Sequence, residues 1–126
     1  MGRKKKENSK ILTEMELKIM KVVWKLNEAT VHDVLNELGE EYAYNTVSTI
    51  IRVLEQKGFT QNRKEGRSHF YSATITKESY EETSLENLTT NLFDDAPLSL
   101  VKRLVGSKKI SALEIEELKQ FLKDQD

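Results

Sequence analysis

Four polar side chains between residues 45 and 52 have the types and the spacing needed to contact the edges of DNA bases. They are Asn45, Ser48, Thr49 and Arg52. They fall at i, i+3, i+4 and i+7, so in a helix they share one face. Asn, Ser and Thr can both donate and accept at a base edge, and Arg can reach guanine or a phosphate. The surrounding segment 42–54 holds no Asp or Glu, although 33% of the chain is charged.

The other face of the same segment is apolar. It consists of Tyr44, Val47, Ile50, Ile51 and Leu54. An amphipathic core helix with an ordinary polar surface would show the same division, so the segment alone leaves both interpretations open. Its neighbours along the chain favour the nucleic-acid interpretation.

Two capped helices precede this segment. Thr13 and Glu16 form a capping box for a helix from Glu14 to about Leu26. Thr30 caps a shorter helix that Gly39 ends, because glycine tolerates the conformation found just past helix ends. A short helix, a turn and a longer helix indicate a helix-turn-helix.

A hairpin is expected directly after the helix. Residues 59–63 and 68–72 are strand-like, and Gly66 between them supplies the positive φ that a tight turn requires. Helix-turn-helix followed by hairpin is the winged-helix arrangement. The hairpin end carries Arg63, Lys64 and Arg67. Exposed hairpin ends are often basic without function, but beside this helix we expect phosphate contacts.

Three amphipathic helices are expected after Ala73. Their apolar stripes consist of Leu85, Leu88, Leu92, Leu98, Val101, Leu104, Ile115, Leu118, Phe121 and Leu122. Three short helices with acidic outer faces make no convincing core, so we expect them to pack on the same segment of a second chain. The alternative is that they fold back as a monomeric cap.

Composition excludes several classes of function. The 126 residues suit one domain, or a small domain with an appendage. There is no cysteine and there are two histidines, His32 and His69, so we expect no metal site and no cofactor. The sequence pattern places His32 on the polar side of its helix, at the surface. No glycine-rich phosphate loop or nucleophile–base pair is present, so we expect no catalytic residues and no enzyme.

Charge is distributed unevenly although the net charge is −1. Residues 1–72 hold 13 Lys and Arg against 10 Asp and Glu, whereas residues 73–126 hold 7 against 11. The basic half can therefore face phosphates. We expect residues 1–10 to be a disordered basic arm. No apolar run suits a signal peptide or a membrane span, so a cytoplasmic protein without a membrane partner is predicted.

The sequence resembles the bacterial penicillinase repressor family, which includes BlaI and MecI and has the copper repressor CopY as a relative. The segments NTVSTIIRVLEQKG, GRSHFYS and ISALEIEELKQFL carry the resemblance, which extends from about Leu12 to Leu122. It implies a winged-helix domain over residues 11–73 and a helical dimerisation domain over residues 74–126. It also implies a homodimer that represses transcription from a palindromic double-stranded operator.

The resemblance also assigns residues. The recognition helix falls on residues 44–57 and the wing on 63–69. The DNA-binding residues so indicated are Tyr44, Asn45, Thr46, Ser48, Thr49, Arg52, Arg63, Lys64, Arg67, Ser68 and His69. Penicillinase repressors are typically inactivated by cleavage of an Asn-Phe bond, which implies a sensor-linked protease as partner. This chain departs from the family there, with Arg103 and Leu104 at the matching positions.

The predicted fold is therefore mainly α with a small β-hairpin: a winged helix-turn-helix plus a C-terminal helical dimerisation domain. The predicted function is a dimeric, sequence-specific DNA-binding repressor. The alternative is a winged-helix protein–protein interaction module, because a fold does not fix a function.

Overall fold

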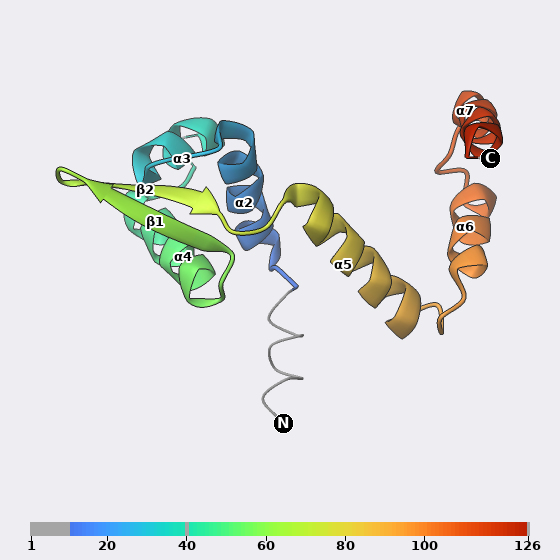
Figure 1. Ribbon diagram of the computed structural model, residues 1–126, viewed down its shortest axis with the longest axis horizontal. Coiled ribbons are helices and arrows are strands. Elements are labelled where there is room, and N and C mark those ends of the chain that lie inside the picture. Colours follow the sequence, from blue (N-terminus) through green and yellow to red (C-terminus); the bar gives the residue numbers. More distant parts are fainter. Residues whose placement is uncertain (1–10, 40, 126) are drawn as a thin grey trace. The chain divides into compact units, whose positions relative to one another are not determined.

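The chain forms helices and one small sheet in the predicted order. The computed structural model describes residues 11–39 and 41–125, and within them there are six helices and a two-stranded antiparallel sheet (Figure 1). The elements are α2 (Glu14–Leu26), α3 (Val31–Leu38), α4 (Tyr44–Gln56), β1 (Thr60–Glu65), β2 (Ser68–Ala73), α5 (Lys77–Asn91), α6 (Pro97–Gly106) and α7 (Ala112–Asp124). The predicted fold class, a mainly α-helical winged helix, is confirmed. The predicted basic arm, residues 1–10, lies outside the described residues.

The helices α2 and α3 start where their sequences place a capping residue. The Thr13 side chain accepts from the Glu16 N–H at 3.2 Å, and the Glu16 carboxylate accepts from the Thr13 N–H at 2.9 Å. Thr30 and Asp33 repeat this exchange at the start of α3. Each exchange satisfies two backbone donors that a helix start otherwise leaves unpaired.

The core of the first part of the chain lies among α2, α3 and α4. Its largest fully buried side chains are Ile19, Met20, Val23, Val34, Val47, Ile51 and Leu54. Because these positions recur at helical spacing, each helix buries one stripe and leaves the opposite face outside. In α4 the buried stripe is Val47, Ile51 and Leu54, so the opposite face of this helix points outward.

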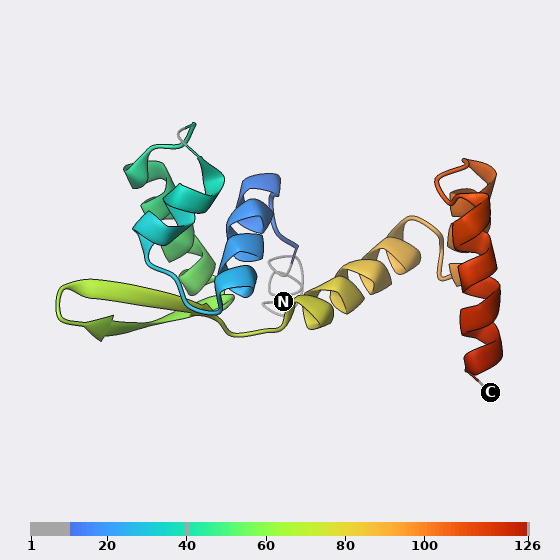
Figure 2. The same cartoon turned by 90° about the horizontal axis from the view of Figure 1, so that it is seen from above.

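The hairpin is fixed to this core at its base. The pairs Thr60–Ala73 and Glu65–Ser68 mark the two ends of its register. Tyr71 exchanges two backbone hydrogen bonds with Ala29, at 2.9 and 2.8 Å, so a single antiparallel bridge ties the α2–α3 connection to β2. Both views show the turn of the hairpin projecting past the three helices (Figures 1 and 2).

An ion pair joins the start of α2 to the end of α4. Lys57 donates to Glu16 at 2.8 Å, and the Glu16 carboxylate is buried. Burial by itself would raise the pKa of Glu16, but the hydrogen bonds from Lys57 and from the Thr13 N–H outweigh it and hold this pKa below its ordinary value of 4.5. The carboxylate thus stays charged while it links two helices.

The chain divides into two compact units, one extending to Ser84 and one from Leu85 onward. The first unit includes the start of α5, because Tyr80 is buried and its hydroxyl accepts from the Leu12 N–H at 2.9 Å. The Tyr80 ring lies 6.0 Å from Trp24 and 6.1 Å from Phe59, between ring centroids. The segment just after the predicted boundary at Ala73 is thus part of the winged-helix unit.

The second unit leaves most of its apolar side chains exposed. A capping box between Ser111 and Glu114 starts α7, as predicted. Among the residues expected to form a dimer interface, Leu104 and Ile115 are half-buried. The exposed ones are Leu85, Leu88, Leu92, Leu98, Val101, Leu118, Phe121 and Leu122. So many exposed apolar side chains on one small unit indicate a surface that another molecule covers.

Candidate nucleic-acid interface

The exposed face of α4 carries most of the polar residues that the sequence singles out. Asn45, Thr46, Thr49 and Arg52 are all exposed. Within α4, the only acidic residue is Glu55 near its end. The Glu55 carboxylate accepts a hydrogen bond from Asn62 of β1 at 2.6 Å, so it is engaged by a neighbouring side chain of the protein. The outward face between residues 45 and 52 is therefore free of acidic groups.

Two residues of α4 lie differently from the pattern read in the sequence. The sequence pattern places Ser48 on the outward face, but it is buried, with 9% of its surface exposed. It follows Val47 in the chain and lies beside Ile51 around the helix, and both of these residues are fully buried. The pattern places Tyr44 on the apolar stripe, but 46% of its surface is exposed. Its ring packs on His32 instead, with 4.9 Å between centroids.

The start of α4 lacks a side-chain cap. Ala43 occupies the N-cap position and makes no side-chain hydrogen bond, in contrast to Thr13 and Thr30 on the preceding helices. The first backbone N–H groups of a helix carry a partial positive charge and bind phosphate readily. An uncapped start beside an acid-free face suits a negatively charged partner.

One face of the hairpin is turned toward α4. Successive residues of a strand point to opposite sides, and paired residues share a side. Asn62 pairs with Tyr71, which is buried, and Asn62 also bonds Glu55 of α4. Lys64 and His69 form the next pair on this side, and His69 Nδ1 lies 3.1 Å from the Asn62 side-chain oxygen. Both are exposed.

Arg63 lies on the opposite face of the hairpin and is held by carboxylates. Its guanidinium donates to both oxygens of Glu28, at 2.7 and 2.9 Å, and also to Glu65. It packs on the ring of its strand partner Phe70, 4.6 Å from the centroid. The hydrogen bonds to Glu28, then those to Glu65, raise the pKa of Arg63 further above its ordinary value. Arg63 therefore ties the hairpin to the α2–α3 connection through Glu28, a role that a basic residue type alone does not indicate.

A cleft of about 310 Å³ lies where α3, α4 and the hairpin meet. Its lining consists of Thr30, Val31, His32, Tyr44, Ser48, Arg52, Arg67, Ser68, His69 and Tyr71. Arg52 from α4 and Arg67 from the hairpin turn thus reach the same cleft. In the described part of the chain, neither arginine forms an ion pair within 4.0 Å. The cleft therefore combines hydrogen-bonding side chains with two cations that no described carboxylate compensates.

Sequence reasoning missed two contributors to this site. Glu28 neutralises Arg63 from 35 residues away, and no local pattern indicates that pairing. His32 is exposed, in agreement with the sequence pattern, but it also lines the cleft and packs on Tyr44. The one sequence signal for this position is that His32 lies in the first turn of α3, two residues after the capping Thr30.

The described residues hold neither a cluster of metal-ligating side chains nor a helix able to span a membrane. Across residues 11–39 and 41–125, no group of three or more His, Asp or Glu side chains could hold a metal ion. Over the same ranges, every helix is too short or too polar to cross a bilayer.

The chain is similar in sequence and fold to known repressors. The family model described as penicillinase repressor matches residues 12–124. The penicillinase repressor of Bacillus licheniformis is 28% identical over 115 residues, which cover 90% of each chain. The solved DNA-binding domain of the repressor BlaI is 31% identical, with a TM-score of 0.50, and the match covers 55% of this chain and 87% of that one. The oxidised form of MarR from E. coli matches 97% of this chain and 86% of its own at 16% identity, with a TM-score of 0.53, a likeness of fold alone.

Proposed function

Because this chain belongs to the penicillinase repressor family, we propose that it is a transcriptional repressor that binds double-stranded operator DNA as a homodimer. One observation carries the proposal. The exposed, acid-free face of α4 and the turn of the hairpin place Arg52 and Arg67 on one cleft without carboxylate partners among the described residues. A solvated helix face of ordinary type would carry paired acids and bases instead.

In this proposal α4 enters the major groove. Asn45 and Arg52 read base edges, since Asn pairs with adenine and Arg with guanine through two hydrogen bonds each. Thr46 and Thr49 lie on the same exposed face and contribute single hydrogen bonds. Ser48 is buried and does not reach a base from its observed position.

The phosphate backbone is contacted around this face. Lys64 and Arg67 of the hairpin are exposed, and Ser68 and His69 lie beside them. The uncapped backbone N–H groups at the start of α4 supply a further anion site. Phosphate contacts hold the protein in register on the duplex, whereas base contacts provide sequence preference. Arg63 is excluded from this set because Glu28 and Glu65 already engage it.

Dimerisation uses the second unit, because most of its apolar side chains on α6 and α7 remain exposed in the single chain. A symmetric pair of chains presents two copies of α4 to a palindromic operator. Half-sites read by two such helices lie about one helical turn apart, roughly 10 base pairs or a multiple of it.

Release from the operator is a separate question. The positions that match the family's cleaved bond, Arg103 and Leu104, lie inside α6. A protease acts on extended backbone, so cleavage there requires α6 to open. If a sensor-linked protease releases this repressor, it must recognise Arg103-Leu104 in place of the Asn-Phe bond that is usual in the family.

A gel-shift series with two variants tests the proposal. Arg52→Ala should lower the affinity for the operator more than for random duplex DNA, by about 1–3 kcal/mol of lost discrimination. The matched variant Arg67→Ala should weaken both duplexes by the same factor. If Arg52→Ala bound operator and random duplex as the unchanged protein does, α4 would not be the reading element. Passage through a DNA column without retention at low salt would favour the interaction-module alternative.

A further inference from the structure

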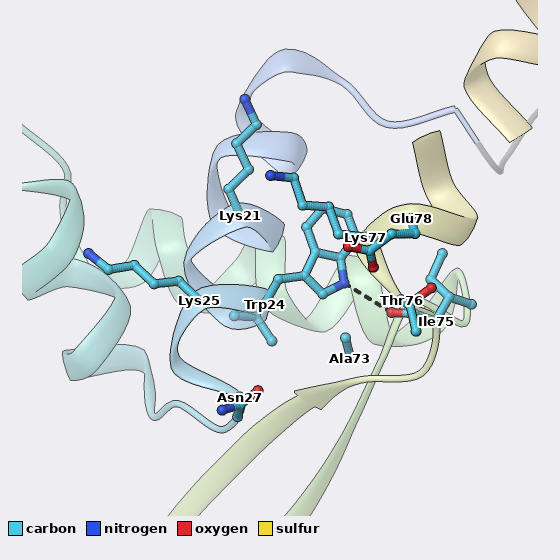
Figure 3. A pocket seen from close by; sticks show the side chains of 10 residues that line it. Lys21, Trp24, Lys25, Asn27, Ala73, Ile75, Thr76, Lys77 and Glu78 are labelled. Carbon is cyan, nitrogen blue, oxygen red and sulfur yellow. Dashed lines mark hydrogen bonds between the residues drawn. The ribbon is translucent and has the colours of Figure 1, made fainter. Parts of the chain in front are cut away.

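A second cleft lies elsewhere on the first unit, at the end of β2 that is farther along the chain from the hairpin turn. It has a volume of about 440 Å³ and is formed by α2, the end of β2 and the start of α5 (Figure 3). The residues that matter for its chemistry are Lys21, Trp24, Lys25, Ile75, Lys77 and Glu78. It shares no lining residue with the cleft beside α4. Its volume is within the range of about 300–1,000 Å³ that is usual for small-molecule sites.

Trp24 forms a fixed aromatic wall of this cleft. Its indole N–H donates to the Ile75 carbonyl at 2.9 Å, drawn as the dashed line in Figure 3. Its ring also packs against Tyr80, with 6.0 Å between centroids. With its one donor engaged and its ring held, half-buried Trp24 offers only an apolar π surface to the cleft. A flat aromatic ring is the natural partner of such a surface.

Two of the three lysines at the cleft carry charges that no described carboxylate compensates. Lys25 pairs with Glu37 of α3 at 2.7 Å, whereas Lys21 and Lys77 form no ion pair with any described residue. Figure 3 shows the side chains of Lys21 and Lys77 extending to the same side of Trp24 and that of Lys25 extending away. Glu78 is the one acidic side chain in the lining.

We propose that this cleft binds a small aromatic carboxylate. Its ring lies on the indole of Trp24, and its carboxylate lies between the ammonium groups of Lys21 and Lys77. An uncharged aromatic compound would gain the stacking but leave both ammonium groups unpaired. A non-aromatic anion would gain the ion pairs but leave the indole in water. The combination of ring and anion is what the lining selects, and it does so independently of DNA binding.

Tryptophan fluorescence tests this directly, because Trp24 is the only tryptophan of the chain. The full chain is titrated with 4-nitrobenzoate and, as a neutral match, 4-nitrobenzamide, with correction for absorbed light. The carboxylate should quench the fluorescence along a saturating curve, and the amide should require a concentration about twofold to thirtyfold higher, because it lacks both ion pairs. Exposed ion pairs contribute about 0.2–1 kcal/mol each, so Lys21→Gln or Lys77→Gln alone should weaken binding by up to about fivefold.

Two further variants test the sign of the charge effect and its restriction to the cleft. Glu78→Gln should tighten binding of 4-nitrobenzoate, because it removes a like charge from the lining. Lys18→Gln should change nothing, because Lys18 lies on α2 but outside the cleft, where it donates to the Tyr42 hydroxyl. Circular dichroism verifies that all variants are folded. Quenching that never saturates, an equal response to the amide, or unchanged binding after the double change at Lys21 and Lys77 would each overturn the proposal.

Discussion

Replacing Arg67 by alanine should weaken binding to every DNA sequence alike and flatten the dependence of affinity on salt. Arg67 is exposed at the hairpin turn and has no ion-pair partner among the described residues. A cation in this state binds a phosphate by releasing condensed counterions from the DNA. The variant therefore loses one such contact and no ion pair within the described part of the protein.

The magnitude follows from counterion release. Each phosphate contact contributes about −0.9 to the slope of log affinity against log salt, so Arg67→Ala should reduce that slope by about 0.9. If the variant and the unchanged protein bind equally at 1 M salt, this difference in slope makes the variant about eightfold weaker at 0.1 M salt. The assay is fluorescence anisotropy of a labelled duplex at five or more salt concentrations, with operator and random sequences in parallel.

The hairpin itself supplies the matched control. The double variant Arg63→Gln with Glu28→Gln removes an arginine from β1, the strand that leads into the turn at Gly66, and keeps the net charge constant. Because Arg63 is already paired, the slope of this double variant should equal that of the unchanged protein. A slope reduced as much as in Arg67→Ala would show that Arg63 leaves Glu28 to bind phosphate, and an unchanged slope in Arg67→Ala would refute the assignment of the wing.

Three further outcomes are expected. Glu16→Gln should lower the free energy of unfolding by about 2 kcal/mol, measured by urea denaturation, because it leaves the partly buried Lys57 ammonium without its charged hydrogen bond. In the unchanged protein the pKa of Glu16 is lower in the folded state than in the unfolded state. Its contribution to stability is therefore complete above about pH 4.5 and is lost as the pH falls through the folded pKa. Glu16→Gln should lack this part of the pH profile of stability. Leu122→Glu should shift the mass measured by analytical ultracentrifugation from dimer to monomer, whereas Lys123→Glu, at the adjacent exposed position on α7, should not.

Local interactions made the helix starts and the hairpin predictable from sequence. Thr13, Thr30 and Ser111 each cap the helix that follows through a residue three positions later, so a short window of sequence holds both partners. Gly66 has φ of +62° at the hairpin turn, which its residue type alone suggests. The acid-free segment 45–52 was likewise visible without a structure, since it is a property of composition and helical spacing.

Only the tertiary structure decided which of the polar groups remain available. Arg63 and Arg67 look equivalent in sequence, but strand alternation turns Arg63 toward Glu28, which the chain brings close from 35 residues away. Ser48 sits at polar spacing on its helix, yet it is buried beside the core and lines the cleft together with Tyr71 of β2. The sequence sets which residue types recur at helical or strand spacing. Whether a side chain is exposed or has an ion-pair partner depends on residues far away in the chain, and no local sequence pattern contains that information.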